Sequence, residues 1–183
     1  MASMVPIPED DGSCNHLTGL HIPSTSLPAT DGNLINLSDI NSKYAVVYCY
    51  PMTSRPGIPP PANWDDILGA RGCTPQSCAF RDLYQEFENY NATVFGLSVQ
   101  STEYQQEAVK RLHLPFVLLS DESMEFTRTL QLPTFTTDGM ELMKRLTLVI
   151  QDGVIQKVFY PVFPSDQNAA EVLEWLGSPR ARP

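Results

Sequence analysis

Residues 72–82 read Gly72-Cys73-Thr74-Pro75-Gln76-Ser77-Cys78-Ala79-Phe80-Arg81-Asp82, a pattern typical of a loop that runs into a helix. Pro75 suits a first helical turn, because the backbone donor that proline lacks has no intrahelical acceptor there. Thr74 can serve as the N-cap, so we expect the helix to begin near residues 74 and 75. Apolar residues then recur at helical spacing and predict one buried face made of Phe80, Leu83, Tyr84 and Phe87.

Two of the four cysteines, Cys73 and Cys78, lie in this stretch. Backbone amides and the helix dipole favour a thiolate at a helix N-terminus, and the thiolate is the reactive form of cysteine. Cys73 is therefore a candidate nucleophile. If both residues are helical, their Cα atoms lie roughly 8.7 Å apart, whereas a disulfide needs about 4.4–6.8 Å. The pair can join only after the first turn unwinds, which favours a transient bond over a permanent one.

The composition indicates a single globular domain of ordinary type. The chain has 183 residues, of which 42% are hydrophobic and 18% charged, enough for one full core. A net charge of −9 argues against a nucleic-acid partner and for a monomer or small oligomer. No stretch approaches the ~20 apolar residues of a membrane span, and residues 1–12 lack the pattern of a targeting peptide. We therefore expect a cytoplasmic protein without a membrane partner.

Strand-like and helix-like segments alternate through the middle of the chain. Residues 44–50 are rich in β-branched and aromatic residues, as in a central strand buried on both faces. Further strands are predicted at 93–99 and 115–121, with helices at 102–112 and 122–130. This alternation implies right-handed crossovers and a largely parallel core sheet.

The two ends of the chain add antiparallel elements. The segments 145–150 and 154–160 flank Gln151-Asp152-Gly153, which is a strong hairpin signal. Two short strand-like pieces also flank the turn at residues 30–33. A last helix, capped by Ser165 or Asp166, should end at Gly177. The predicted class is α/β, with a central mixed β-sheet flanked by helices and an N-terminal extended or hairpin segment.

We divide the chain into an irregular leader at 1–16, one domain at 17–177 and a tail at 178–183. Within the domain, residues 51–72 form a proline-rich loop beside the reactive cysteine, and long loops in compact domains are commonly functional. Cys14, in the leader, is expected to be an exposed thiol. Cys49, inside an apolar strand, is expected to be a small core residue.

Less specific interpretations fit the same residues. A Cys-x4-Cys pair alone is as compatible with inert buried thiols as with a redox couple. A zinc site would need further ligands at structural spacing, and no other Cys or His pair supplies them, so we expect no metal and no cofactor. A disulfide oxidoreductase is disfavoured because Cys-x-x-Cys is absent. Arg145, taken alone, is compatible with a structural ion pair.

Several motifs together make the chain similar to a known family. It resembles the peroxiredoxins, most closely the Q-type or bacterioferritin-comigratory subgroup, over nearly its whole length. The resemblance implies a thioredoxin-like fold, reduction of hydrogen peroxide and alkyl hydroperoxides, thioredoxin or a similar dithiol protein as reductant, and a monomer. The pieces that carry it are Leu27-Pro28-Ala29-Thr30-Asp31-Gly32, Tyr48-Cys49-Tyr50-Pro51, residues 72–82, residues 114–121 and Arg145.

By position in the family pattern, Cys73 is implied to be the peroxidatic cysteine and Cys78 the resolving cysteine of an intramolecular disulfide. Arg145 is implied to lie over the thiolate and to orient the peroxide. A peroxide sensor or redox relay, passing oxidation to a partner protein, would use the same chemistry at Cys73 and is the alternative function.

The chain departs from the family pattern in one place. The pattern P-x-x-x-T/S-x-x-C puts a hydroxyl three residues before the peroxidatic cysteine, where this chain has Ala70. Pro51 lies 22 residues before Cys73, so we interpret 51–72 as an insertion within the active-site loop. Thr53 is predicted to supply the missing hydroxyl, with Ser54 as the alternative.

Overall fold

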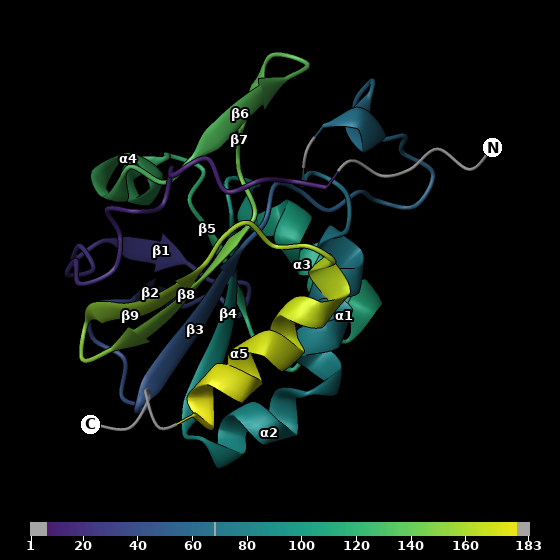
Figure 1. The fold of residues 1–183 in the computed structure, drawn as a ribbon. Helices are drawn as coiled ribbons and strands as arrows, with labels where there is room; N and C mark the ends of the chain where they lie inside the picture. The colour runs from purple at the N-terminus through teal and green to yellow at the C-terminus, as the bar shows by residue number, and fades with distance from the viewer. Residues whose placement is uncertain (1–6, 68, 179–183) are drawn as a thin grey trace.

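A five-stranded sheet forms the centre of the computed structural model, which describes residues 7–67 and 69–178. Its strand order is β5-β4-β3-β8-β9, with β3 parallel to β4, β4 parallel to β5, and β8 antiparallel to both β3 and β9 (Figure 1). The predicted mixed sheet is confirmed. The strands are β3 (Tyr44–Cys49), β4 (Ala92–Ser98), β5 (Leu118–Ser120), β8 (Leu146–Gln151) and β9 (Val154–Phe159).

Strand β3 is buried at every residue, as its composition predicts. Because side chains alternate along a strand, Val46 and Tyr48 enter the core on one face, and Val47 and Cys49 enter the core on the other. The sheet therefore separates two hydrophobic cores, one on each side.

Helices supply the outer wall of both cores. Four helices contribute to the core that contains Tyr48, and Figure 1 shows α5 lying along α1 and α2 in front of the sheet. They are α1 (Cys73–Asp82), α2 (Tyr84–Asn89), α3 (Thr102–Leu112) and α5 (Asn168–Leu176). The opposite core takes Phe126 from α4 (Glu125–Leu130) and Leu27 from the hairpin of β1 (Ser26–Pro28) and β2 (Leu34–Asn36).

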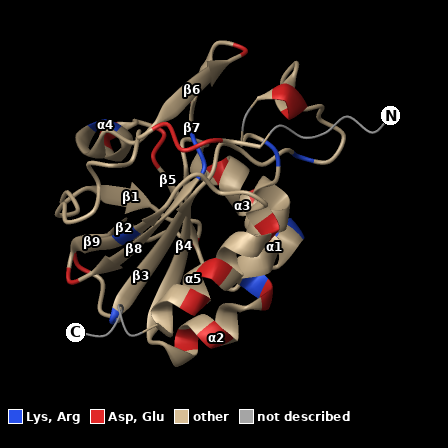
Figure 2. Ribbon diagram, in the orientation of Figure 1, with Lys and Arg blue, Asp and Glu red and all other residues tan. Residues whose placement is uncertain are grey.

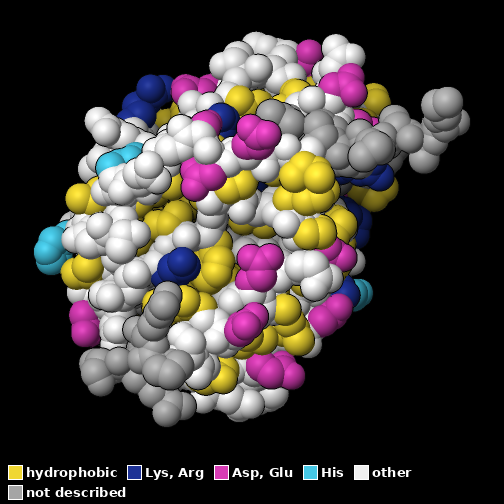
Figure 3. Space-filling view, in the orientation of Figure 1, with side chains coloured by type: hydrophobic (Ala, Val, Ile, Leu, Met, Phe, Trp, Pro, Cys, Tyr) yellow, Lys and Arg dark blue, Asp and Glu magenta, His cyan; other side chains and the backbone are white. Residues whose placement is uncertain are grey.

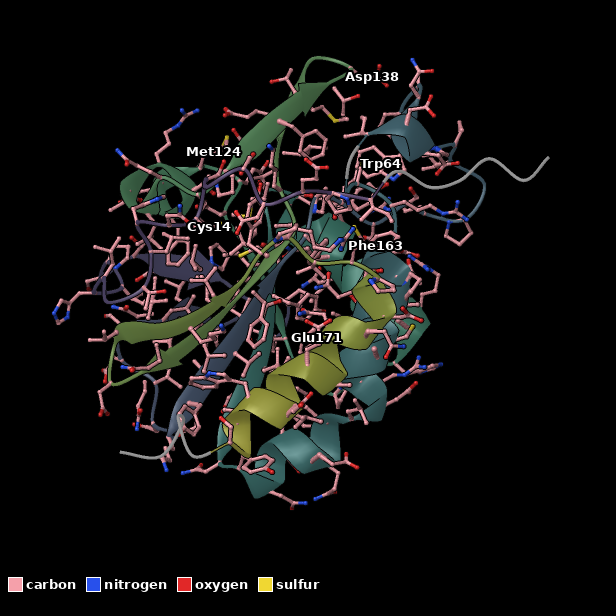
Figure 4. All side chains as sticks on the ribbon, in the orientation of Figure 1. Cys14, Trp64, Met124, Asp138, Phe163 and Glu171 are labelled. Atoms are coloured by element: carbon pink, nitrogen blue, oxygen red, sulfur yellow. The ribbon has the colours of Figure 1, made fainter. Side chains whose placement is uncertain are left out.

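Two hairpins use the same turn residues, and only one of them was predicted from the sequence. The β8–β9 turn places Asp152 and Gly153 at positive φ, as an Asp-Gly turn requires. A second hairpin joins β6 (Thr134–Thr137) to β7 (Met140–Met143) through Asp138 and Gly139, also at positive φ. Asp138 marks its tip in Figure 4. The missed signal was another Asp-Gly pair.

The proline-rich loop packs against this second hairpin. It contains one 3₁₀ turn, η1 (Trp64–Asp66). The Trp64 ring lies 6.1 Å, centroid to centroid, from the ring of Phe135, and Trp64 shares a small core with Ala70 and Leu142. Figure 4 shows Trp64 on the loop near this hairpin.

Both predicted helix N-caps are wrong. Helix α1 begins at Cys73 with Gly72 as N-cap, so Thr74 already lies in the first turn. Helix α5 is preceded by the 3₁₀ turn η2 (Ser165–Gln167), and its N-cap, Gln167, makes no side-chain cap. A glycine in left-handed conformation and a short 3₁₀ turn set these starts, in place of hydroxyl or carboxylate capping.

Acidic side chains are frequent on the helical face. Figure 2 marks the positions of Asp and Glu residues along α2 and α5, and Figure 3 shows acidic side chains dispersed among hydrophobic ones on the same face of the molecule. Within the described ranges, none of the helices has the length and apolar character needed to cross a bilayer. The predicted leader and tail extend beyond these ranges, and the division of the chain into segments stays a prediction.

We predict that Gly96→Ala will destabilise the protein. A Cβ at Gly96 would lie 2.8 Å from the hydroxyl of the fully buried Tyr48 and would collide with Leu118. Overpacking of this kind typically lowers the free energy of unfolding by about 1–3 kcal/mol. The loss should appear as a lower midpoint of urea unfolding. Thr93→Ala, on the same strand, loses only one half-buried hydroxyl hydrogen bond, worth about 1 kcal/mol. Equal midpoints for Gly96→Ala and wild type would contradict this packing.

Candidate active site

Cys73 is the first residue of α1, and the local backbone depends on glycine. Gly72 has φ 109°, a conformation that glycine adopts without strain. A Cβ at Gly72 would also collide with the Ser165 hydroxyl of η2. The first turn of α1 therefore packs directly on the segment that leads into α5. This contact fixes the Cys73 side chain, which is 5% exposed, at the positively polarised end of the helix.

The guanidinium of Arg145 contacts the Cys73 sulfur. Arg145 immediately precedes β8, and its Nη2 donates to Cys73 Sγ at 3.0 Å. Both side chains are buried, with Arg145 only 3% exposed. The guanidinium therefore places a fixed positive charge and a hydrogen-bond donor against the sulfur where water is excluded.

Backbone carbonyls hold the guanidinium in place. Arg145 Nη2 donates to the carbonyls of Ala70 and Arg71 at 2.9 and 3.2 Å, and Nε donates to that of Gly69 at 3.3 Å. The end of the proline-rich loop thus forms a cradle of three successive carbonyls. Ala70, where the family pattern has a hydroxyl residue, contributes its backbone in this cradle.

A buried polar chain continues from Arg145 into the helices. Arg145 Nη1 donates to Gln76 Oε1 at 2.6 Å, and Gln76 Nε2 donates to Asn168 Oδ1 at 3.1 Å. Thr147 Oγ1 donates to the same Asn168 oxygen at 2.6 Å. Gln76, Thr147 and Asn168 have no measurable solvent exposure. These residues were not predicted from the sequence. The one signal for them is Gln76, which precedes Phe80 by four residues and so interrupts the apolar stripe of α1.

Thr53 lies away from the sulfur. Its side chain is buried, and its hydroxyl and amide both donate to Gln100 Oε1, at 3.3 and 3.1 Å. Apart from Arg145, the contact found for Cys73 Sγ within the described residues is the Ala70 carbonyl, at 3.8 Å. The structure therefore does not bring Thr53 to Cys73 by a hydrogen bond, and its catalytic role stays a prediction. Ser54 uses its carbonyl to accept from Arg111.

Cys78 lies on α1 together with Cys73, and both thiols are free. Cys78 is partly exposed, whereas Cys73 is buried. Because α1 is helical through both positions, the helix geometry keeps their Cα atoms too far apart for a disulfide. The structure is that of the reduced state.

The other two cysteines are buried in the opposite core. Cys49 lies in β3 as predicted, and burial raises the pKa of its thiol well above the ordinary value. The expectation of an exposed Cys14 is wrong, because this residue is 7% exposed and packs in the same core. Burial, followed by the negative charges of Asp11 and Asp10, raises the pKa of Cys14 to about 12. Neither thiol forms a thiolate at neutral pH.

A hollow of about 240 Å³ opens beside the start of α1. Gly72, Pro75 and Phe163 are among its lining residues. Figure 4 shows Phe163 near the N-terminal end of α5. No group of three or more His, Cys, Asp or Glu residues that could hold a metal ion occurs in the described part of the chain.

Comparison with known proteins identifies the family of the chain. The profile of the Redoxin family matches residues 17–173. The chain belongs to the Redoxin family. Within it, the chain is a peroxiredoxin of the Q type. It is 34% identical to "Peroxiredoxin Q, chloroplastic" of Sedum lineare over 85% of this chain and 75% of that protein. It is 26% identical to "Putative peroxiredoxin bcp" of Coxiella burnetii, over 85% of this chain and 95% of that protein.

Solved structures share the fold. Peroxidoxin BcpB from Mycobacterium tuberculosis superposes with a TM-score of 0.72 at 26% identity, covering 92% of this chain and 99% of that one. A cysteine-to-serine mutant of PrxQ from Xylella fastidiosa has a TM-score of 0.71 at 23% identity, over 88% and 96% of the two chains. The expected thioredoxin-like fold is confirmed. This peroxiredoxin is a thiol-dependent peroxidase, as the family implies.

We predict that alkylation will separate the four thiols. With iodoacetamide on the reduced native protein at pH 7, Cys73 and Cys78 should be modified, while Cys14 and Cys49 remain intact because burial keeps them protonated. Peptide mass spectrometry reads each site, and a urea-unfolded sample provides the control in which all four react. Modification of Cys14 at pH 7 in the folded protein would contradict this assignment.

Proposed function

We propose that Cys73 is the peroxidatic cysteine, that Arg145 orients the peroxide, and that Cys78 resolves the oxidised sulfur. The observation that carries the proposal is the 3.0 Å contact between Arg145 Nη2 and Cys73 Sγ at the first residue of α1. It combines a nucleophile with a fixed donor in one buried place.

In the first step, the Cys73 thiolate attacks the nearer oxygen of a hydroperoxide. The O–O bond breaks, the sulfur becomes a sulfenic acid, and the distal oxygen leaves as an alkoxide or hydroxide that takes a proton to give an alcohol or water. Arg145 and the amides of the first helical turn stabilise the charge that develops on the leaving oxygen. The carbonyl cradle of Gly69, Ala70 and Arg71 keeps the guanidinium from reorienting during the step.

In the second step, the Cys78 thiol condenses with the sulfenic acid. An S–S bond forms and water leaves, so the two sulfurs share the oxidation that Cys73 carried. The helical separation of the two Cα atoms requires the first turn of α1 to open beforehand. A dithiol protein of the thioredoxin kind then restores both thiols by exchange.

The substrates, the oligomeric state and the compartment belong to the same proposal. Hydrogen peroxide and alkyl hydroperoxides are the substrates, the protein is a monomer, and neither nucleic acid nor membrane is a partner. The compartment is the reducing cytoplasm. The plant relatives are named chloroplastic, and that location is a property of those proteins.

Serine variants of the two cysteines test the roles separately. We expect Cys73→Ser to abolish rapid peroxide consumption in stopped-flow measurements, because the nucleophile is gone. Cys78→Ser should keep the first oxidation within about twofold of wild type but lose turnover with thioredoxin and its reductase. Unchanged peroxide consumption by Cys73→Ser would refute the proposal. Stable mixed disulfides with one partner protein, without turnover by wild type, would identify the relay instead.

Arg145→Lys should slow the first oxidation by about 100-fold, because lysine keeps the charge but lacks the fork of donors that holds both the sulfur and the cradle. The measurement is the second-order rate constant of sulfenic acid formation under single-turnover conditions. Arg128→Lys, at an exposed arginine on α4, is the matched control and should match wild type. A rate for Arg145→Lys equal to that control would remove Arg145 from the mechanism.

A further inference from the structure

Helix α1 is held closed by a buried hydrogen bond from a residue between the two cysteines. Gln76 lies in the first turn of α1, and its backbone N–H donates to the Gly72 carbonyl at 3.0 Å. Its side chain is fully buried and bridges Arg145 on one side and Asn168 on the other. The first turn cannot unwind without breaking both side-chain contacts, because Gln76 moves with the backbone that must open.

The Asn168 end of this bridge belongs to rigid elements. Asn168 is the first residue of α5, and its Oδ1 also accepts from Thr147 of β8. Thr147 pairs with Tyr48 in the middle of the sheet. The oxygen that holds Gln76 is therefore fixed by the sheet and by α5, neither of which needs to move when α1 opens.

The side-chain amide of Asn168 is hydrogen-bonded through its oxygen but not through its nitrogen. Its Oδ1 accepts two hydrogen bonds, whereas its buried Nδ2 has no partner among the described residues. A buried unpaired donor carries a desolvation penalty. Water that enters when Gln76 leaves can hydrate this donor, so the closed state retains a cost that the open state relieves. The hydrogen bond from Gln76 to Asn168 therefore favours the wound first turn of α1 but still allows it to unwind.

We infer that Asn168, fixed by Thr147, is a positioning residue that sets how readily α1 unwinds after Cys73 is oxidised. The inference rests on the proposed roles of Cys73 and Cys78 and concerns their second step. A firmer bond to Gln76 prolongs the sulfenic acid and exposes it to further oxidation by a second peroxide, which gives a sulfinic acid and water. A weaker bond speeds disulfide formation and protects Cys73.

Two substitutions at Asn168 should act in opposite directions. Asn168→Ala removes the acceptor, and the loss of one net hydrogen bond should speed disulfide formation about tenfold. Asn168→Asp keeps the accepting oxygen, replaces the unpaired donor and adds a negative charge toward Arg145. It should resolve no faster than wild type and give more sulfinic acid per turnover. Gln167→Ala, at the adjacent exposed residue, is the matched control.

Rapid-quench mass spectrometry measures sulfenic acid, disulfide and sulfinic acid after one equivalent of peroxide. The first oxidation should stay within about threefold of wild type in Asn168→Ala, because Arg145 keeps its three backbone carbonyls. Amide hydrogen exchange of the reduced protein provides a readout independent of activity. In Asn168→Ala, the backbone amide of Gln76, which donates to the Gly72 carbonyl, should exchange about tenfold faster, and in Asn168→Asp it should not.

The outcomes test the role of Asn168 and the proposed function separately. If alanine and aspartate change resolution in the same direction, or if neither changes it, the inference is overturned. If Asn168→Ala does not fold, Thr147→Val removes one donor to Asn168 and should speed resolution about threefold, with equal rates again overturning the inference. If wild type forms no Cys73–Cys78 disulfide, the proposed function fails, while hydrogen exchange still tests the bond to α1.

Discussion

The contact between the Arg145 guanidinium and the Cys73 sulfur is the interaction on which the site depends, and three parts of the chain must meet to form it. The sulfur comes from the start of α1, the guanidinium from the residue before β8, and the cradle of carbonyls from residues 69–71. A buried arginine is tolerated only where its donors are satisfied. The carbonyls, Gln76 Oε1 and the sulfur satisfy them together, so the loop before α1 is part of the site as much as the two side chains are.

The fold explains how these parts stay together while one of them moves. β3, β8 and α5 form a fixed frame, since β3 and β8 are paired along their length and α5 packs on the sheet. α1 is attached to this frame by its apolar residues and by the polar chain through Gln76 and Asn168. Its C-terminal half is anchored by Phe80, which stacks on Tyr48 at 4.7 Å between ring centroids. The first turn has no such apolar anchor of comparable size, which makes it the part that can open.

Periodicity and turn chemistry predicted most of the fold, because β3, α3 and the β8–β9 hairpin carry strong local signals. The helix starts were mispredicted where local hydroxyl caps competed with tertiary contacts: Gly72 is required by its conformation and by the approach of Ser165, which no local pattern encodes. Cys73 was identified as a candidate nucleophile by its place at a helix start and Arg145 through the family motifs, although the two residues are 72 positions apart. Asn168 was not, since an asparagine at a helix start ordinarily indicates a cap, and its partners are distant in sequence. Cys14 was misjudged because a polar stretch around it hid one buried position.

The loop that carries the cradle also carries an indole. Trp64 is 9% exposed and shares a small core with Ala70, whose carbonyl holds Arg145. Trp175, the second tryptophan, lies on α5 and packs against the core that contains Tyr48. The chain thus has one fluorescent side chain in the loop that leads to Cys73, and a second one on α5, which belongs to the fixed frame. When each indole is observed alone, with the other tryptophan replaced, its emission distinguishes a rearrangement of the loop from loosening of the whole molecule without any attached dye.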